Sequence, residues 1–101
     1  MKEVYIVKHD IYCYEEGTYE SFVEILSDED SARTYFEIKK EQVMQEYYDY
    51  TGVDSFQELE DNYDFYSDLE PTVYGLPYLF VNLEDFGFDK LVVQKKDIMS
   101  F

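Results

Sequence analysis

Carboxylates between Tyr50 and Thr72 are the side chains of this sequence with the clearest capacity for chemistry. The segment reads YTGVDSFQELEDNYDFYSDLEPT and contains no Lys or Arg. At 3.6 residues per helical turn, one set of its acids falls within about 40° on either side of Asp54 on a helical wheel. This set consists of Asp54, Glu58, Asp61 and Asp68, with Asp64 at its border. Such a row could serve acid–base catalysis, hold a cation or recognise positive charge.

The first two chemistries find little support in the sequence. Acids are so numerous that no pair stands out as a general acid and base. An EF-hand calcium loop beginning at Asp61 would need oxygen ligands at its third and fifth positions and Gly at its sixth. Those positions hold Tyr63, Phe65 and Tyr66. We therefore predict no metal site and no cofactor.

Nucleophilic catalysis is equally unsupported. His9 and Cys13 lie four residues apart on a predicted strand, which is too far for a thiolate–imidazole pair. Their ordinary interpretation is a strand histidine and a half-buried cysteine. The sequence has no Gly-rich phosphate-binding loop. We expect a protein that is not an enzyme.

Recognition of positive charge fits the acidic row better. Residues three or four apart on a helix stand about 5–6 Å apart at Cβ, comparable to neighbouring phosphates of a nucleic-acid strand. A solvated helix usually interleaves lysines with such acids, and this one does not. The predicted partner-binding residues are Asp54, Glu58, Asp61, Asp64, Phe65 and Asp68, together with Glu46 and Asp49. Phe65 falls in the acidic row, either as an exposed aromatic anchor or packed under the C-terminal hairpin.

The net charge of the whole chain supports a basic partner. It is −16, from 24 Asp and Glu against eight Lys and Arg. From Glu41 to Asp89 there are 13 acids and no basic residue. Self-repulsion of this size weakens a fold, so a functional reason is worth weighing against mere solubility or salt adaptation. Anionic membranes and nucleic acid would both repel such a molecule, and we expect it to bind neither.

The elements that position these acids can be predicted from local patterns. Alternating β-branched and aromatic residues predict strands at 3–14 and 19–26, joined by a turn at Gly17. A helical period with Ser27 as N-cap predicts a helix from Ser27 to Tyr50, stopped by Gly52. Its predicted apolar stripe consists of Ala32, Tyr35, Phe36, Val43, Tyr47 and Tyr50.

Similar local patterns predict the elements of the second half of the chain. Asp54 or Ser55 should cap a second helix to about Leu69, ended by Pro71. On this helix Phe56, Leu59, Tyr63 and Tyr66 would form the core-facing stripe. Two strands around a turn near Gly87 complete the order β-β-α-α-β-β. The expected fold is α+β, an antiparallel sheet of about four strands with two helices.

The composition indicates one domain over residues 1–101. Apolar residues make up 46% and aromatic residues 20% of the chain, so it should fold rather than remain disordered. A single cysteine excludes an intramolecular disulfide and favours a reducing cytoplasm. The N-terminus resembles no signal peptide, and no apolar run is long enough to cross a membrane.

Small size, extreme acidity, high Tyr and Phe content and missing catalytic motifs resemble the DNA-mimic inhibitors encoded by bacteriophages and mobile elements. The resemblance covers the whole chain in character and rests on no motif, so it assigns no residue. It implies a bacterial host, with a partner such as the histone-like protein HU or a restriction or CRISPR nuclease. The alternative is a small acidic interaction or regulatory module without DNA mimicry. An exposed strand edge or the surplus tyrosines could also support a homodimer.

Overall fold

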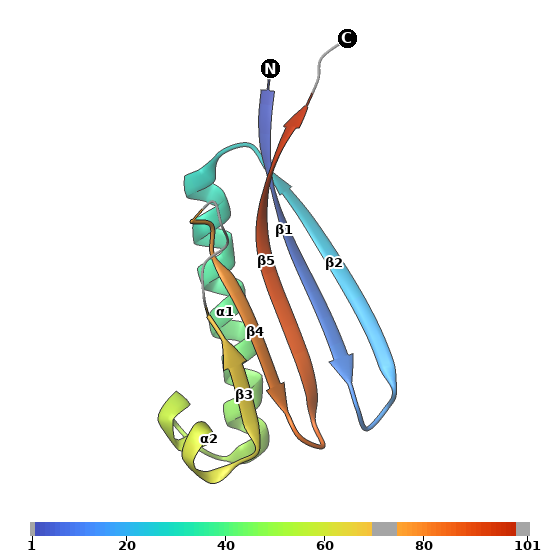
Figure 1. The fold of residues 1–101 in the computed structure, drawn as a ribbon, viewed down its shortest axis with the longest axis vertical. Helices are drawn as coiled ribbons and strands as arrows, with labels where there is room; N and C mark the ends of the chain where they lie inside the picture. The colour runs from blue at the N-terminus through green and yellow to red at the C-terminus, as the bar shows by residue number, and fades with distance from the viewer. Residues whose placement is uncertain (1, 70–74, 99–101) are drawn as a thin grey trace.

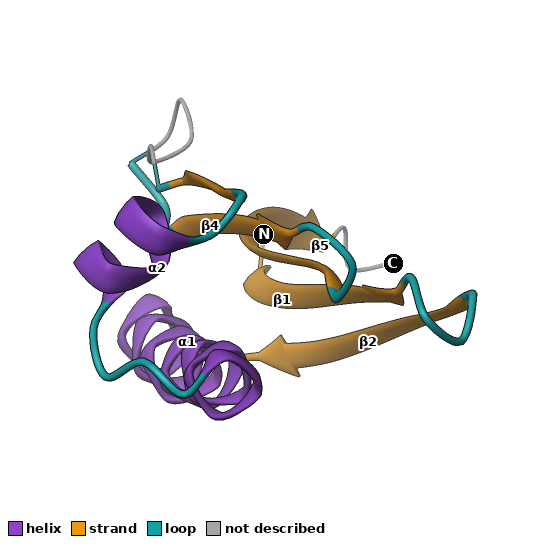
Figure 2. Cartoon of the chain, turned by 90° about the horizontal axis from the view of Figure 1, so that it is seen from below, coloured by secondary structure: helices purple, strands orange, loops and turns teal. Residues whose placement is uncertain are grey.

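The computed structural model describes residues 2–69 and 75–98. Their fold is α+β, as predicted, with one five-stranded antiparallel sheet and two helices (Figure 1). The strand order is β2-β1-β5-β4-β3. The long helix packs on one face of the sheet, and no helix of the described residues covers the other face (Figure 2). The molecule is elongated, with extents of 52 × 27 × 20 Å.

Strands β1 (Lys2–Cys13) and β2 (Thr18–Leu26) form the predicted N-terminal hairpin. Gly17 closes the turn with a φ of 67°, which glycine adopts without a steric penalty. The buried side chains of β1, such as Val7, face the long helix. Strand β2 extends beyond the helix, so Glu24, which lies opposite Val7, is exposed. Strand β2 is an edge strand, and nearly all of its residues are exposed.

Helix α1 (Glu29–Thr51) follows the predicted helix closely. Its N-cap is Asp28 rather than Ser27, because the Asp28 carboxylate accepts a 2.7 Å hydrogen bond from the backbone N–H of Ser31. This bond and one from the Ser31 hydroxyl lower the pKa of Asp28. Gly52 ends the helix in the left-handed region, as predicted.

The second helix is much shorter than the sequence predicts. Helix α2 spans Phe56–Asn62, with Ser55 as its N-cap, and its last turn closes at Tyr63. Strand β3 (Phe65–Asp68) then replaces the expected helical continuation to Leu69. The predicted stop at Pro71 lies outside the described residues.

Pairing with a distant strand explains this difference. Phe65 and Tyr66 favour a strand, and β3 pairs antiparallel with β4, where Phe65 lies opposite Leu83. The Phe65 ring packs edge-to-face on Phe56 and Tyr47, so the pairing also extends the core. The sheet therefore has five strands rather than four, in the order β-β-α-α-β-β-β.

Strands β4 (Tyr78–Leu83) and β5 (Gly87–Ile98) form the predicted C-terminal hairpin. Side chains along β4 alternate between partly and fully buried, as expected for a strand covered on one face. Gly87 stands against β1, where a Cβ atom would lie only 2.0 Å from the Tyr12 carbonyl oxygen. Close packing of β1 on β5 therefore requires glycine at this position.

The core lies between α1 and the covered face of the sheet. The helix contributes Ala32, Phe36, Val43 and Tyr47, which confirms most of its predicted apolar stripe. Tyr50, also predicted on that stripe, is 52% exposed and lies against the ring of Phe86. The sheet contributes the buried residues Val7, Leu79, Val81, Leu91 and Val93.

A buried polar network crosses this core. Asp89 is almost fully buried, and one of its carboxylate oxygens lies 2.8 Å from Nε2 of His9. The other oxygen accepts a 2.9 Å hydrogen bond from the Tyr47 hydroxyl. Burial, followed by the Asp89 charge, raises the pKa of Tyr47, which therefore remains a donor. The network ties α1 to β1 and β5 through one carboxylate.

Tyr47→Phe should destabilise the protein by about 1–3 kcal/mol, because Asp89 would lose a partner without gaining water. Urea unfolding followed by circular dichroism at pH 7 measures the change. Tyr50→Phe is the matched control on the same helix, at an exposed ring, and should leave the midpoint nearly unchanged. Equal stability of Tyr47→Phe and the parent protein would mean that this hydrogen bond contributes nothing net.

Candidate partner-binding surface

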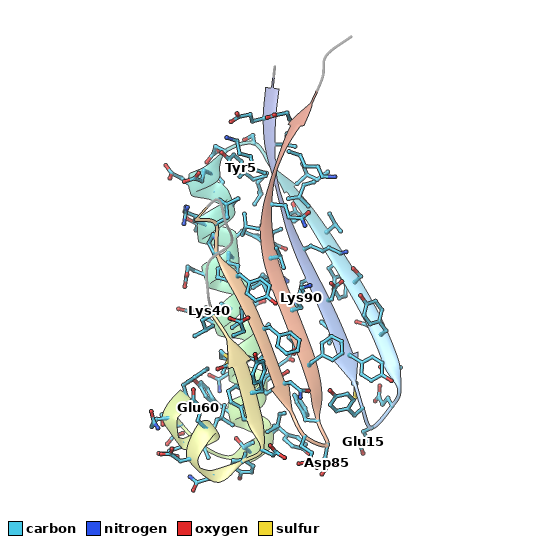
Figure 3. All side chains as sticks on the ribbon, viewed as in Figure 1. Tyr5, Glu15, Lys40, Glu60, Asp85 and Lys90 are labelled. Carbon is cyan, nitrogen blue, oxygen red and sulfur yellow. The ribbon has the colours of Figure 1, made fainter. Side chains whose placement is uncertain are left out.

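Exposed carboxylates converge at one end of the elongated molecule. We call this surface the acidic end; Figure 3 shows three of its members, Glu15, Glu60 and Asp85, at the same end of the ribbon. The acidic end consists of Glu15, Glu16, Asp49, Asp54, Glu58, Glu60, Asp61, Asp64, Glu84 and Asp85. All ten residues lie within positions 9–32 and 41–89, where the sequence contains no Lys or Arg.

Chain reversals bring these acids together. Helix α1 ends at the turn around Gly52, and α2 crosses the same end of the molecule beside β3 (Figure 1). The β4–β5 turn also lies there, as does the β1–β2 turn. A 3.1 Å hydrogen bond from the Tyr14 N–H to the Phe86 carbonyl connects these two turns. The charge therefore comes from four separate stretches of sequence.

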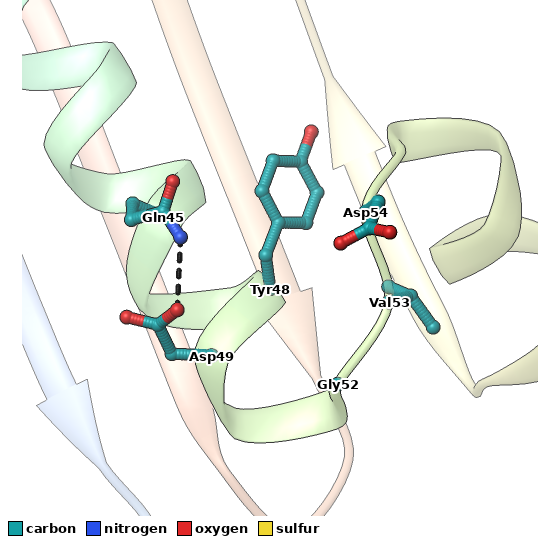
Figure 4. A pocket seen from close by; sticks show the side chains of 6 residues that line it. All are labelled: Gln45, Tyr48, Asp49, Gly52, Val53 and Asp54. Carbon is teal, nitrogen blue, oxygen red and sulfur yellow. Dashed lines mark hydrogen bonds between the residues drawn. The ribbon is translucent and has the colours of Figure 1, made fainter.

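A shallow depression of about 280 Å³ lies between the end of α1 and the loop before α2 (Figure 4). Asp49 and Asp54 stand on its two sides, with Tyr48 between them. Gln45 donates a 2.8 Å hydrogen bond to the Asp49 carboxylate and fixes its direction. Two carboxylates around an aromatic ring can receive a cationic side chain.

A second depression of about 370 Å³ lies where the acidic end meets the helix-free face of the sheet. Its rim carries the three carboxylates of Asp64, Glu84 and Asp85, while Tyr14 and Tyr66 supply aromatic rings. The Tyr14 hydroxyl donates a 2.6 Å hydrogen bond to the side chain of Asn82. This arrangement offers a guanidinium both charge-assisted hydrogen bonds and a ring surface.

Crowding of the carboxylates has an electrostatic cost. A hydrogen bond with Asp64 raises the pKa of Glu84, and the negative charges of Asp64 and Asp85 raise it further. Partial burial, followed by the charge of Asp89, raises the pKa of Glu46 on α1. Positive charge from a bound partner would relieve both groups.

Several predicted site residues lie at the acidic end, although they do not share one helix face. Asp54, Glu58 and Asp61 belong to α2 or the loop before it, and Asp64 follows α2. Asp49 lies across the first depression from Asp54. Glu46 is exposed on α1, and partial burial of its carboxyl followed by the charge of Asp89 raises its pKa.

Asp68 and Phe65 do not take their predicted places. Asp68 lies on β3, partly buried, so it is not part of a helical carboxylate row. Phe65 is partly buried against the core and is not an exposed anchor; it lies on a strand beside the C-terminal hairpin rather than under it, with its ring on Phe56 and Tyr47. Tyr63 and Tyr66, predicted to face the core, are exposed because the helix ends before them.

Other residues of the acidic end were not predicted from the sequence. Glu84 and Asp85 sit in the β4–β5 turn, and Glu15 and Glu16 sit in the β1–β2 turn. Only the pairing of β1 with β5 places these two turns at the same end. Acids in both turns were a visible signal, but their proximity depends on strand order.

Comparison with models of known protein families, with curated proteins and with solved structures finds no match to this chain. Neither helix of the described residues has the length and apolar character needed to cross a membrane. Within residues 2–69 and 75–98, no three His, Cys, Asp or Glu side chains are grouped so as to hold a metal ion.

Glu84→Gln should raise the denaturant midpoint at pH 7, because it removes one charge from a repelling cluster. A raised carboxyl pKa in the folded state lowers stability as pH rises through that pKa. The advantage of the variant should therefore shrink as pH falls through this raised pKa toward 4.5, the ordinary value for Glu, and be largely lost below it.

Urea unfolding at pH 7 and pH 4 measures both effects. Glu20→Gln on β2 makes the same charge change away from the acidic end and is the control. If both variants gain equally at pH 7, total charge rather than local crowding sets the cost.

Proposed function

We propose that this protein is an acidic DNA-mimic inhibitor that occupies the DNA-binding surface of a basic nucleic-acid-binding protein. The observation that carries the proposal is the acidic end, where ten exposed carboxylates from four stretches of chain meet without an intervening Lys or Arg. A surface of this kind offers a basic protein the charge that it normally finds on a phosphate backbone.

Electrostatics supports such a role in two ways. A concentrated negative surface steers a basic partner from a distance and raises the association rate. A hydrogen bond with Asp64, followed by the charges of Asp64 and Asp85, raises the pKa of Glu84, and positive charge from a bound partner would offset that repulsion. Duplex DNA would compete for the same lysines and arginines.

Aromatic side chains beside the carboxylates would provide selectivity. Tyr14 and Tyr66 line the second depression, and Tyr48 lines the first. Phosphate groups offer no such apolar surface. An arginine that contacts a carboxylate and stacks on a tyrosine would distinguish this protein from DNA.

We take a histone-like protein of the HU type as the first partner to test, in the cytoplasm of a bacterial host. Restriction and CRISPR nucleases are the next candidates, because their DNA channels are also basic. In this proposal the protein has no enzymatic activity of its own, needs no cofactor and does not bind nucleic acid directly.

Competition with duplex DNA tests the proposal. The protein should displace labelled duplex from HU in a fluorescence anisotropy titration. With six or more charge pairs, its affinity should fall by a factor on the order of 10³ between 50 and 200 mM salt. Binding that is insensitive to salt and coexists with DNA on the same partner would contradict mimicry.

Charge-neutral variants test the location of the surface. Glu58→Gln, Glu60→Gln and Asp61→Asn together should weaken binding to HU at least about 10-fold. The control neutralises three exposed acids away from the acidic end, Glu20, Glu24 and Glu37, each to Gln. Titration calorimetry at fixed salt compares the two, and equal losses would mean that only net charge matters.

The alternative function is a small acidic interaction or regulatory module without DNA mimicry. One observation favours it specifically: the helix-free face of the sheet carries aromatic side chains where water-facing strands usually carry polar ones. A partner bound there would not need a DNA-binding surface. Salt-resistant binding that leaves DNA in place would support this alternative.

A further inference from the structure

The sheet face opposite α1 has the composition of an interface. We call it the open face. Strand register assigns Tyr12 and its neighbours to it, because the alternate residues Tyr5, Val7 and His9 of β1 face the helix. A sheet with one solvated face normally alternates apolar and polar residues. Here large apolar side chains point in both directions.

An aromatic row crosses the open face. Tyr66 on β3 packs on Phe80 of β4, with ring centroids 5.9 Å apart. Phe80 lies 5.8 Å from Phe88 of β5, which stacks at 5.5 Å on Tyr12 of β1. Tyr19 of β2 pairs in register with Tyr12. The row therefore reaches from one edge of the sheet to the other.

Aliphatic residues of β2 extend the apolar surface. Val23 and Ile25 share the side of β2 that carries Tyr19, and they are 57% and 63% exposed. Ser21 separates Tyr19 from Val23 along β2, so the open face carries two apolar areas, the aromatic row and these aliphatic side chains. Large exposed apolar areas on a protein surface are typical of interaction sites.

The charge of the open face differs from that of the rest of the molecule. Lys8, Lys90 and Lys96 lie on its central strands, and Figure 3 shows Lys90 at mid-length of the sheet. Asp10 and Asp68 are the acids that register places with them. Three positive and two negative charges of the described residues nearly balance here, although the chain as a whole carries −16.

We propose that the open face is the interface of a homodimer, in which two copies pack sheet against sheet. Copies of so acidic a protein repel one another wherever acids meet. A surface with nearly balanced charge is where two of them can approach without that cost. The face carries charges of both signs, so lysines of one copy and aspartates of the other could pair across it, which gives the pairing charge complementarity.

The available area is sufficient. The five strands are 4 to 12 residues long. Spaced about 4.8 Å apart, at about 3.3 Å per residue, they present roughly 680 Å². Two copies would cover about 1,400 Å², which exceeds the roughly 1,000 Å² expected of a specific interface. Aligned packing of two such faces is the arrangement found in β-sandwiches.

Repulsion also selects the orientation of the two copies. A two-fold axis across the strands places the acidic ends at opposite tips of the dimer, whereas an axis along the strands would place them side by side. The molecule is 52 Å long, several times the Debye length of about 8 Å at physiological salt. The antiparallel arrangement therefore removes nearly all repulsion between the acidic ends.

Sedimentation equilibrium over a range of protein concentrations tests the proposal. The parent protein should approach twice the monomer mass of 12.2 kDa. Added salt should strengthen the dimer, because it screens the repulsion between two acidic copies. The expected salt effect is opposite in sign to that on HU binding, so failure of either proposal leaves the other testable.

Two lysine variants locate the interface. Val23→Lys with Ile25→Lys should raise the dimer dissociation constant on the order of 100-fold, as two disrupted interface contacts would. The control is Phe22→Lys with Ile38→Lys, at residues of similar exposure that do not lie on the open face, with the same charge change. Circular dichroism confirms that both variants fold.

Three results would overturn the proposal. The first is a monomer at every concentration and salt level. The second is equal weakening by both variants, which would place the interface elsewhere, such as along the β2 edge. The third is a monomer whose open-face variant loses binding to a different protein, which would make the face a site for that partner.

Discussion

Mutual repulsion among carboxylates is the constraint on which the rest of this structure depends. A chain with a net charge of −16 must gain enough from burial to offset its own electrostatic field. It does so with large side chains, since Tyr47, Phe36 and the leucines of the sheet fill the space under α1. Most acids remain at the surface, where water screens them. Asp89 is buried, and its two carboxylate oxygens find hydrogen-bond partners in His9 and Tyr47, on two other elements.

Local sequence signals predicted the elements that local forces determine. Both hairpins, helix α1 and its stop at Gly52 follow from alternation, helical period and a glycine in the left-handed region. The segment after Asn62 was predicted wrongly because its aromatic spacing fits a helical wheel. Pairing with β4 and burial of Phe65 against Tyr47 outweigh that preference, and neither contact is visible within the segment.

The acidic surface was predicted in part for a similar reason. A run of acids without lysine indicates a negative region wherever it folds, so Asp54, Glu58 and Asp61 were identified from sequence. Glu84 and Glu15 join them only through the order of the strands, which no local pattern specifies. The contact between His9 and Asp89 joins residues 80 positions apart, and no local sequence pattern predicts it either.

The two proposed functions need different surfaces on the same fold, and these surfaces overlap only at their border. A mimic of DNA needs dense negative charge, whereas self-association needs a surface on which charge is nearly balanced. The turns collect acids at one end, while most of the aromatic row, from Phe80 to Tyr12, occupies the open face. Tyr66 belongs to both, since it lines the second depression and packs on Phe80. In an antiparallel dimer each copy would keep its acidic end free at a tip. Association through the open face would then double the number of mimicking surfaces without bringing their charges together.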